Sequence, residues 1–225
     1  MWKVSGVLMS RGLYDGIMDF LTGTGLAASA GLNAYIPLLV LGLLDRYTQF
    51  VNLGSGFDWL SNGWAIIILS VFLALEVVAD KIPAVDTVND FIQTIVRPTS
   101  GGIVFGSTAV SNIAGFSVGG SDTVTDPEAY VQSGAWVAIV VGIIIALLVH
   151  LFKMTTRPLI NGATVGVGAP MVSTAEDATS VLLSIAAIFL PILAALILVA
   201  IAIPVTMAVS RIRARKKRSQ AATTY

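Results

Sequence analysis

Two arginines of this chain stand in a repeated sequence pattern of a kind that can bind an anion. Arg97 and Arg157 each precede a proline, and each copy continues as R-P-x-x-x-G-x-x-x-G, displaced by 60 residues. Proline suits the first turn of a helix, and the positive end of a helix attracts negative charge. We therefore expect helices to begin at Pro98 and Pro158, with both arginines contacting an anionic group of a substrate.

The glycines of this repeat admit two interpretations. They are Gly102, Gly106, Gly162 and Gly166. Residues four apart share one face of a helix, and glycine there lets a neighbouring backbone approach closely. The favoured interpretation is that the glycines pack helices together. The alternative is that they line a polar path of the kind that discontinuous helices form in transporters.

One acid and the only histidine lie in apolar segments, where an ionisable side chain is costly and therefore a functional candidate. Glu76 and His150 could relay protons or bind a cation if the fold brings them together. The favoured alternative is that Glu76 and Asp80 pair with Lys81, Arg97 or Arg157, while His150 reaches the membrane surface. An enzyme that uses these two residues ranks third among the functions considered, so we expect no enzymatic activity.

Two asparagines complete the predicted substrate-binding set. Asn33 precedes Pro37 by four residues, so its carbonyl loses the usual helical hydrogen bond, and its side chain adds further polar groups. Such a bend is expected either to bind substrate or to pack against a neighbour, and Asn161 admits the same two interpretations. Glu176 and Asp177 are expected only to cap the start of the last helix.

Several classes of site are excluded by what the chain lacks. The sequence contains no cysteine, which excludes disulfides and cysteine-based metal sites, and we expect no metal and no cofactor. No zinc-protease, serine-hydrolase or phosphate-loop motif is present. The basic tail is short and close to an apolar segment, so we expect no binding of nucleic acid.

The elements that must position these residues are membrane helices. Hydrophobic residues make up 56% of the chain and charged residues only 12%, more apolar surface than a water-soluble core could hide. We expect an all-α, polytopic integral membrane protein with five to six transmembrane helices and a duplicated helical hairpin. The predicted spans are 16–44, 62–80, 98–118, 134–153, 158–175, which either crosses the membrane or is re-entrant, and 178–208.

The distribution of positive charge predicts the topology. Six crossings would place 12 of the 13 Lys and Arg residues on one side, which marks that side as cytoplasmic. Residues 1–15 and the basic tail 209–225 are then both cytoplasmic, in a cell membrane, and the tail is expected to meet anionic lipid. The amphipathic segment 82–96 is expected to lie along the cytoplasmic interface.

Three blocks of sequence resemble a known family. GLNAYIPLLVLGL at 31–43, ADKIPAVDTVNDFIQTIVRPTSGG at 79–102 and the block at 150–180 are similar to signature blocks of a bacterial multi-pass membrane family, catalogued as a domain of unknown function (DUF4126). The resemblance covers most of residues 20–205. It implies a membrane location and carries no established activity.

For function, the leading hypothesis is a small transporter, channel or lipid-handling protein for an anionic or small polar substrate. The alternative is a non-transporting scaffold or regulatory subunit, in which the glycines only pack and the tail recruits a partner. Because a few short helices leave little room for an enclosed path, we also expect a homo-oligomer.

Overall fold

The computed structural model describes residues 2–54, 56–110, 112–113, 116–117, 136–164 and 168–200, with three further positions at 203, 207 and 211. Apart from three two-residue strands its architecture is all-helical, which confirms the all-α part of the predicted fold class. The elements are α1 (Trp2–Leu32), α2 (Tyr35–Tyr47), a 3₁₀ turn η1 (Asp58–Ser61), α3 (Gly63–Ala79), α4 (Pro83–Thr108), α6 (Trp136–Thr164) and α7 (Ala169–Phe189). A short apolar helix, Pro191–Ala200, follows α7.

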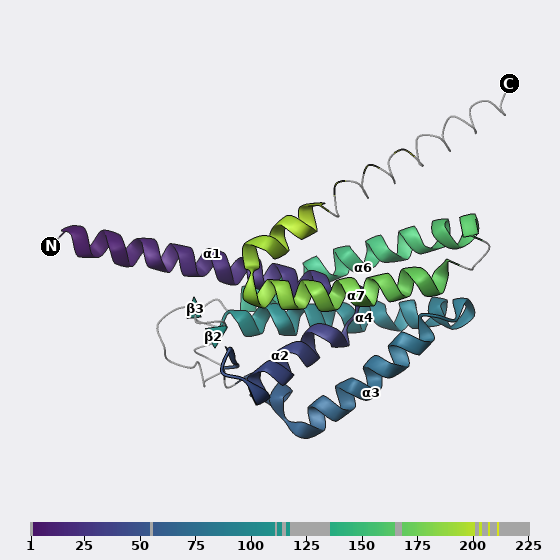
Figure 1. Cartoon of the computed structure of the whole chain (residues 1–225), viewed down its shortest axis with the longest axis horizontal. Coiled ribbons are helices and arrows are strands. Elements are labelled where there is room, and N and C mark those ends of the chain that lie inside the picture. The colour runs from purple at the N-terminus through teal and green to yellow at the C-terminus, as the bar shows by residue number, and fades with distance from the viewer. Residues whose placement is uncertain are drawn as a thin grey trace.

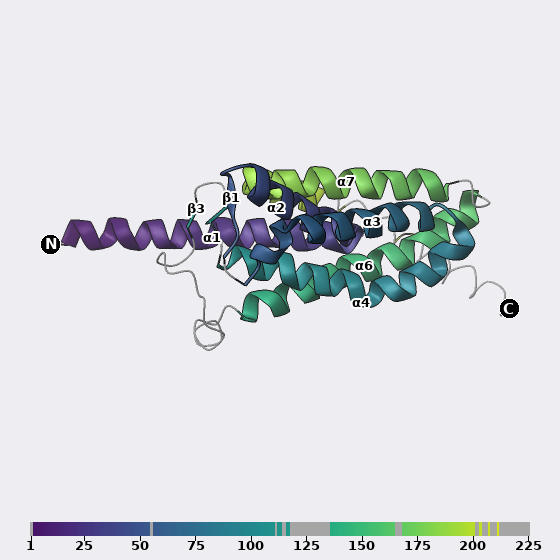
Figure 2. The same ribbon diagram turned by 90° about the horizontal axis from the view of Figure 1, so that it is seen from below.

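Helix α1 is the centre of the bundle, packed between α4, α6 and α7 (Figures 1 and 2). Its small residues allow this close approach: a Cβ atom at Gly23 would collide with Phe105 of α4, and one at Gly31 with Val149 of α6. Ser29 joins α1 to α7, because its Oγ lies 2.7 Å from the hydroxyl oxygens of both Ser180 and Ser184. Small side chains thus replace bulky apolar packing along this helix.

The first apolar segment forms a helical hairpin, which differs from the single span predicted over 16–44. Helix α1 ends at Leu32 near the middle of the bundle, and α2 turns back toward the end from which α1 entered (Figure 1). The cause is Asn33, whose side-chain Oδ1 accepts hydrogen bonds from the backbone N–H groups of Tyr35 and Ile36. These bonds begin a new helix immediately after the old one ends.

The two Arg-Pro sites do not begin new helices, contrary to prediction. Pro98 lies inside α4 and Pro158 lies inside α6. Neighbouring helices can compensate for a proline within an apolar bundle, so the helix continues through it. In consequence the predicted segment 98–118 ends as a helix at Thr108, and the predicted segment 158–175 is divided between the end of α6 and the start of α7.

A small antiparallel ladder closes one end of the bundle. It consists of three two-residue strands, β1 (Val51–Asn52), β2 (Asn112–Ile113) and β3 (Phe116–Ser117), in the order β1-β2-β3. Because β1 follows α2 and β2 follows α4, the ladder ties the base of the hairpin to the end of α4. The first turns of α1 extend from this same end, opposite the connection between α3 and α4 (Figure 1).

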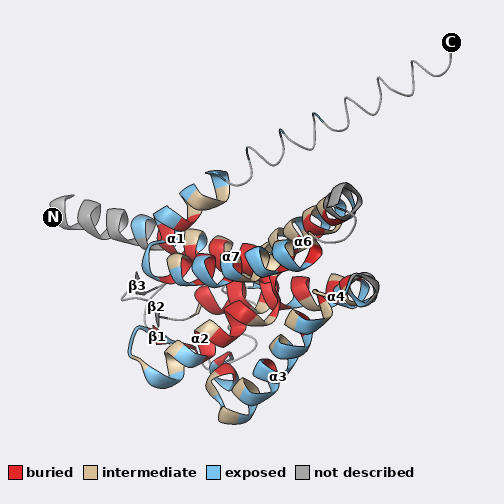
Figure 3. Cartoon of the chain, turned by 45° about the vertical axis from the view of Figure 1, so that its right-hand side comes forward, coloured by how far each residue is buried: buried red, intermediate tan, exposed pale blue. Residues whose placement is uncertain are grey.

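The molecule is apolar on its outside and charged within. Exposed residues lie on the outer faces of α3, α4, α6 and α7, and buried residues gather toward the centre of the bundle (Figure 3). Many of the exposed residues are large and apolar, while the buried residues include three cations, His150 and several carboxylates. Two described helical segments, Trp136–Pro158 and Ala169–Phe189, are long and apolar enough to cross a bilayer, and α3 and Pro191–Ala200 are shorter apolar helices. This arrangement agrees with association of the protein with a membrane.

Candidate functional site

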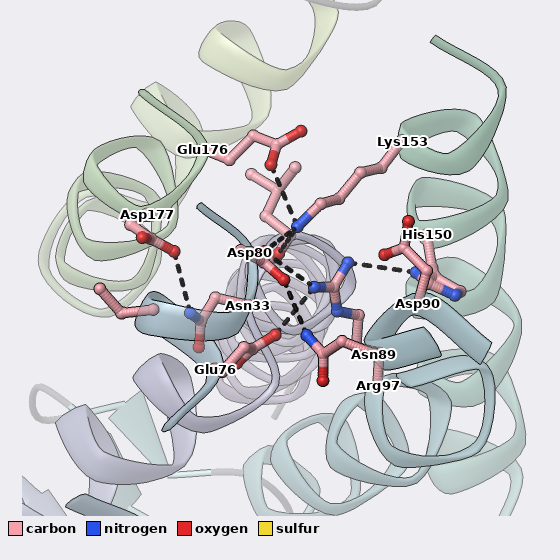
Figure 4. Close-up of polar contacts among 12 residues, drawn as sticks. Asn33, Glu76, Asp80, Asn89, Asp90, Arg97, His150, Lys153, Glu176 and Asp177 are labelled. Atoms are coloured by element: carbon pink, nitrogen blue, oxygen red, sulfur yellow. Dashed lines mark hydrogen bonds and ion pairs between the residues drawn. The ribbon is translucent and has the colours of Figure 1, made fainter. Parts of the chain in front are cut away.

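The candidate site is a buried ionic network centred on Asp80, the residue that ends α3 (Figure 4). Asp80 Oδ2 lies 3.0 Å from Lys153 Nζ, 3.0 Å from Arg157 Nη2 and 3.6 Å from Arg97 Nη2. Its other oxygen, Oδ1, accepts a hydrogen bond of 2.7 Å from Asn89. One carboxylate therefore joins α3 to two turns of α4 and two turns of α6.

Arg97 links the network to Glu76 and His150. Its Nη2 lies 2.8 Å from Glu76 Oε1, and its Nη1 lies 3.1 Å from His150 Nδ1. The opposite ring nitrogen of His150 lies 3.1 Å from the hydroxyl of Thr94. All three of Glu76, Arg97 and His150 are at most 2% exposed, so His150 does not reach the membrane surface.

Helix α7 contributes two adjacent carboxylates. Glu176 Oε2 contacts both Lys153 Nζ, at 3.0 Å, and Arg157 Nη2. Asp177 accepts a hydrogen bond of 3.0 Å from the side chain of Asn33. Both acids lie inside α7, which begins at Ala169, so the prediction that they cap the start of a helix is wrong.

The tip of the α1–α2 hairpin rests on the same network. Lys153 Nζ donates a hydrogen bond of 3.1 Å to the backbone oxygen of Leu32, and Arg97 Nη1 donates one of 3.5 Å to that of Gly31. The last carbonyl groups of a helix have no partner within it and carry its negative end, which attracts cations. Lys153 and Arg97 thus neutralise the end of α1 in the interior of the bundle.

Asp90 is a further buried acid, one to two turns before Arg97 on α4, and lies beside His150 in Figure 4. Burial raises the pKa of its carboxyl group above the usual range, and the nearby positive charges of Arg157, Arg97 and Lys153 oppose that rise. Its Oδ1 has no hydrogen-bond partner in the described part of the chain. The position therefore favours the neutral acid more than an exposed aspartate would.

The structure brings five of the predicted substrate-binding residues into one cluster. Glu76, Arg97, His150 and Arg157 belong to the ionic network, and Asn33 lies beside it, bound to Asp177, the residue after Glu176. The sixth predicted residue, Asn161, belongs to α6, but its side chain lies outside the described part of the structure.

The glycines of the repeat have the following positions. Gly102 and Gly106 are buried in α4, and a Cβ atom at Gly102 would press against Ile143 and Ile139 of α6. Gly162 belongs to α6, and Gly166 lies outside the described residues. The next contact along the same interface is between the backbones at Gly101 and Gly142, where neither position has room for a side chain.

Three central residues of the network were absent from the predicted substrate-binding set: Asp80, Lys153 and Glu176. The expected pairing of Asp80 with Arg97 or Arg157 is nevertheless confirmed. Lys153 could have been identified from the sequence, because it is a single charge that follows a long apolar segment. The position of Glu176 inside α7 depends on the helix beginning at Ala169, a start that Pro170 marks. Among the described residues, no group of three His, Asp or Glu side chains is arranged to hold a metal ion.

Comparison with known proteins identifies the family. Searches of curated proteins and of solved structures returned no match. A family profile described as a domain of unknown function matches residues 20–211, a region that contains the whole ionic network. The resemblance expected from the sequence blocks is thereby confirmed. The chain belongs to the DUF4126 family.

Proposed function

We propose that the protein is a multi-pass membrane transporter for a small polar or amphiphilic molecule. The observation that supports this proposal is the position of the ionic network: it lies at the tip of a hairpin that ends inside an otherwise apolar bundle. Discontinuous helices that end at membrane depth are a common way for transporters to build a substrate or ion site.

We place α3, the later part of α4, α6 and α7 across the bilayer. The 17 residues of α3 span roughly 26 Å at 1.5 Å per residue, close to the thickness of the hydrocarbon core. The exposed apolar face of α4 at Val85, Val88 and Phe91 then meets the membrane interface. Four Lys or Arg residues, Lys81, Arg97, Lys153 and Arg157, lie toward the α3–α4 end. Arg46 lies toward the ladder, and Lys3 and Arg11 belong to the first turns of α1, which extend from the ladder end. On this majority we assign the α3–α4 end to the cytoplasm.

This orientation changes the proposed position of the N-terminus. Because α1 enters the bundle from the ladder end, its first residues fall on the outer side rather than in the cytoplasm. The predicted six-crossing topology had placed them in the cytoplasm, because it treated residues 16–44 as one crossing.

The ionic network contains buried polar atoms without partners, as expected of side chains that exchange hydrogen-bond partners during transport. Isolated buried charges cost several kcal/mol each, and only complete pairing offsets that cost. Here the pairing is incomplete, because Glu76 Oε2, Arg97 Nε and Gln93 Oε1 have no hydrogen-bond partner among the described residues. Unsatisfied buried polar atoms are rare in proteins and are typical of sites that bind or rearrange.

A specific observation favours the alternative, a scaffold or regulatory subunit without transport. Gly101 and Gly102 lie against α6, and Gly142 lies against α4, so these glycines serve helix packing. In the scaffold hypothesis the network serves only to fix five helical segments together, and it never opens.

Flux measurements in vesicles distinguish the two. Purified protein in liposomes would be tested for movement of ethidium, carboxyfluorescein and a fluorescent lysophospholipid, with protein-free liposomes as the baseline. We expect flux of at least one probe, its loss in Asp80→Asn, and its retention in Asp58→Asn, because Asp58 is exposed on η1 outside the network. Absence of flux for all three probes with folded protein would favour the scaffold.

A further inference from the structure

A cavity of about 450 Å³ lies beside the ionic network, bounded by α1, α6, α7 and the helix Pro191–Ala200. Its volume falls within the range of roughly 300–1,000 Å³ that small-molecule sites occupy. Most of its lining is apolar, including Leu148, Phe152 and Leu198. Four polar side chains complete the lining: Lys153, Thr156, Glu176 and Thr179. The cavity therefore suits a molecule with an apolar body and one polar group.

The hydrogen-bond donors among these four side chains are already occupied. Lys153 Nζ donates hydrogen bonds to Leu32 O at 3.1 Å and to Asp80 Oδ2 at 3.0 Å, and it forms an ion pair with Glu176 Oε2 at 3.0 Å. The hydroxyl groups of Thr156 and Thr179 donate to backbone oxygens of their own helices. A ligand that needs donors, such as a carboxylate or phosphate, would have to displace one of these bonds.

The cavity does have an unoccupied hydrogen-bond acceptor. Glu176 uses Oε2 for both Lys153 and Arg157, while its Oε1 accepts no bond from the described residues. The Glu176 side chain is 14% exposed, against 1% for Lys153, so it is the more accessible member of the pair. A ligand group that donates hydrogen bonds can thus bind Glu176 without breaking the network.

The chemistry of the free acceptor favours a positive ligand. Oε1 of Glu176 is a carboxylate oxygen, and a carboxylate binds a charged donor group more strongly than a neutral one.

We propose that this cavity binds an amphiphilic amine, with its protonated ammonium group on Glu176 and its hydrocarbon body between α6 and α7. Such a ligand would satisfy the free acceptor and fill the apolar lining. The inference rests on the proposed transport function for its biological setting, and it names the substrate class as a lipophilic cation rather than an anion.

Binding of three probes with one chain length tests the proposal: dodecylammonium, dodecanol and dodecanoate. Protein in phosphatidylcholine nanodiscs would be titrated with each radiolabelled probe, and binding to empty nanodiscs would be subtracted. We expect saturable binding of dodecylammonium, weaker binding of dodecanol and none of dodecanoate. Binding of dodecanoate at equal or higher affinity would overturn the assignment of a cation.

Two variants locate the site. Glu176→Gln should weaken dodecylammonium binding roughly tenfold or more, the usual effect of losing a hydrogen bond to a charged group. Because Glu176 also pairs with two cations, Ala175→Trp provides a second variant that fills the cavity and leaves every charge in place. It should abolish binding, and Asp58→Asn should change nothing. Unchanged binding in both cavity variants would refute the site.

Binding and transport can fail separately in these experiments. If dodecylammonium binding requires Glu176 but no probe crosses the vesicle membrane, the binding site is supported and the transport function is refuted. If flux continues in Ala175→Trp, the transport function is supported and this cavity is refuted as its substrate site.

Discussion

Arg97 and His150 face each other in the centre of the bundle, with Arg97 Nη1 3.1 Å from His150 Nδ1. A guanidinium group can only donate, so Nδ1 must accept, and the imidazole is therefore neutral with its proton on Nε2. That proton points to the hydroxyl oxygen of Thr94, 3.1 Å away, which in turn donates to the Asp90 carbonyl. His150 is thus fixed in one tautomer by α4 on both sides.

Replacement of His150 should test this arrangement. His150→Phe removes the acceptor for Arg97 and leaves a buried charged donor without a partner, which costs about 1.5–3 kcal/mol. We expect a clear fall in the thermal unfolding temperature of the purified protein. His150→Gln keeps a side-chain acceptor, so its unfolding temperature should fall less. Equal loss in the two variants would mean that the packing of the ring, and not its hydrogen bond, is what matters.

The pair of Arg97 with Glu76 should behave as a buried ion pair. Arg97→Met leaves Glu76 unpaired and should destabilise the protein by about 3–5 kcal/mol, while Arg97→Met combined with Glu76→Met should recover much of the loss. Lys81→Met is the matched control, because Lys81 is 36% exposed and lies 3.9 Å from Asp177. Its effect should stay below about 1 kcal/mol. Denaturant or thermal unfolding of the four proteins provides the comparison.

Asp90 should make stability depend on pH in a defined direction. Burial raises the pKa of Asp90 in the folded protein above its unfolded value of about 3.9, so its stabilising effect is complete below that pH and is lost as pH rises through the folded pKa. Asp90→Asn should therefore raise the unfolding temperature at neutral pH and have little effect near pH 4. An equal effect at both values would contradict the assigned shift.

The hairpin makes a prediction about topology that cysteine labelling can check, since the chain has no native cysteine. Tyr14→Cys and Gln49→Cys should react with a membrane-impermeant maleimide from one side of the membrane, and Ile82→Cys from the other. All three positions are exposed. If residues 16–44 formed a single crossing, Tyr14→Cys would react from the same side as Ile82→Cys.

Replacement of glycine by alanine should destabilise the protein at Gly142, where two helices are in close contact, but not at Gly16. A Cβ atom at Gly142 would collide with the backbone of Gly101 and with Phe105, so Gly142→Ala should destabilise by about 1–3 kcal/mol. A Cβ atom at Gly16 meets nothing within 4 Å. Gly16→Ala should therefore be neutral or slightly stabilising, because alanine favours helix. Thermal unfolding of both variants measures the difference.

The sequence predicted an all-helical fold and several members of the site, but not how they are connected. Isolated ionisable side chains in apolar segments identified Glu76 and His150, and the repeated Arg-Pro pattern identified Arg97 and Arg157. The local pattern around Pro98 and Pro158 indicated helix starts, yet both helices continue. Local preference was overridden by tertiary contacts, because each preceding arginine is held by carboxylates from other helices.

Local sequence patterns also failed to predict the reversal of the chain at Asn33 and the role of the α7 carboxylates, because both depend on contacts between distant segments. A break at Asn33 was expected, but a bend and a reversal look alike in sequence, and only the contacts of the hairpin tip with Lys153 and Asp177 separate them. Glu176 and Asp177 resemble capping residues because Ser173 and Thr174 precede them. Where α7 begins decides their role, and the local signal of that start is Pro170 in the first turn of the helix.

The serine contact between α1 and α7 has a mechanical consequence. Ser29 Oγ reaches Ser180 and Ser184, which lie one helical turn apart, and also donates to the Ser180 carbonyl. Because Ser29 Oγ meets hydroxyl oxygens from two successive turns of α7 at once, a shift of α7 along α1 would break one of these contacts. The three serines therefore fix the axial register of α7 against α1, and with it the depth at which Glu176 and Asp177 lie in the bundle.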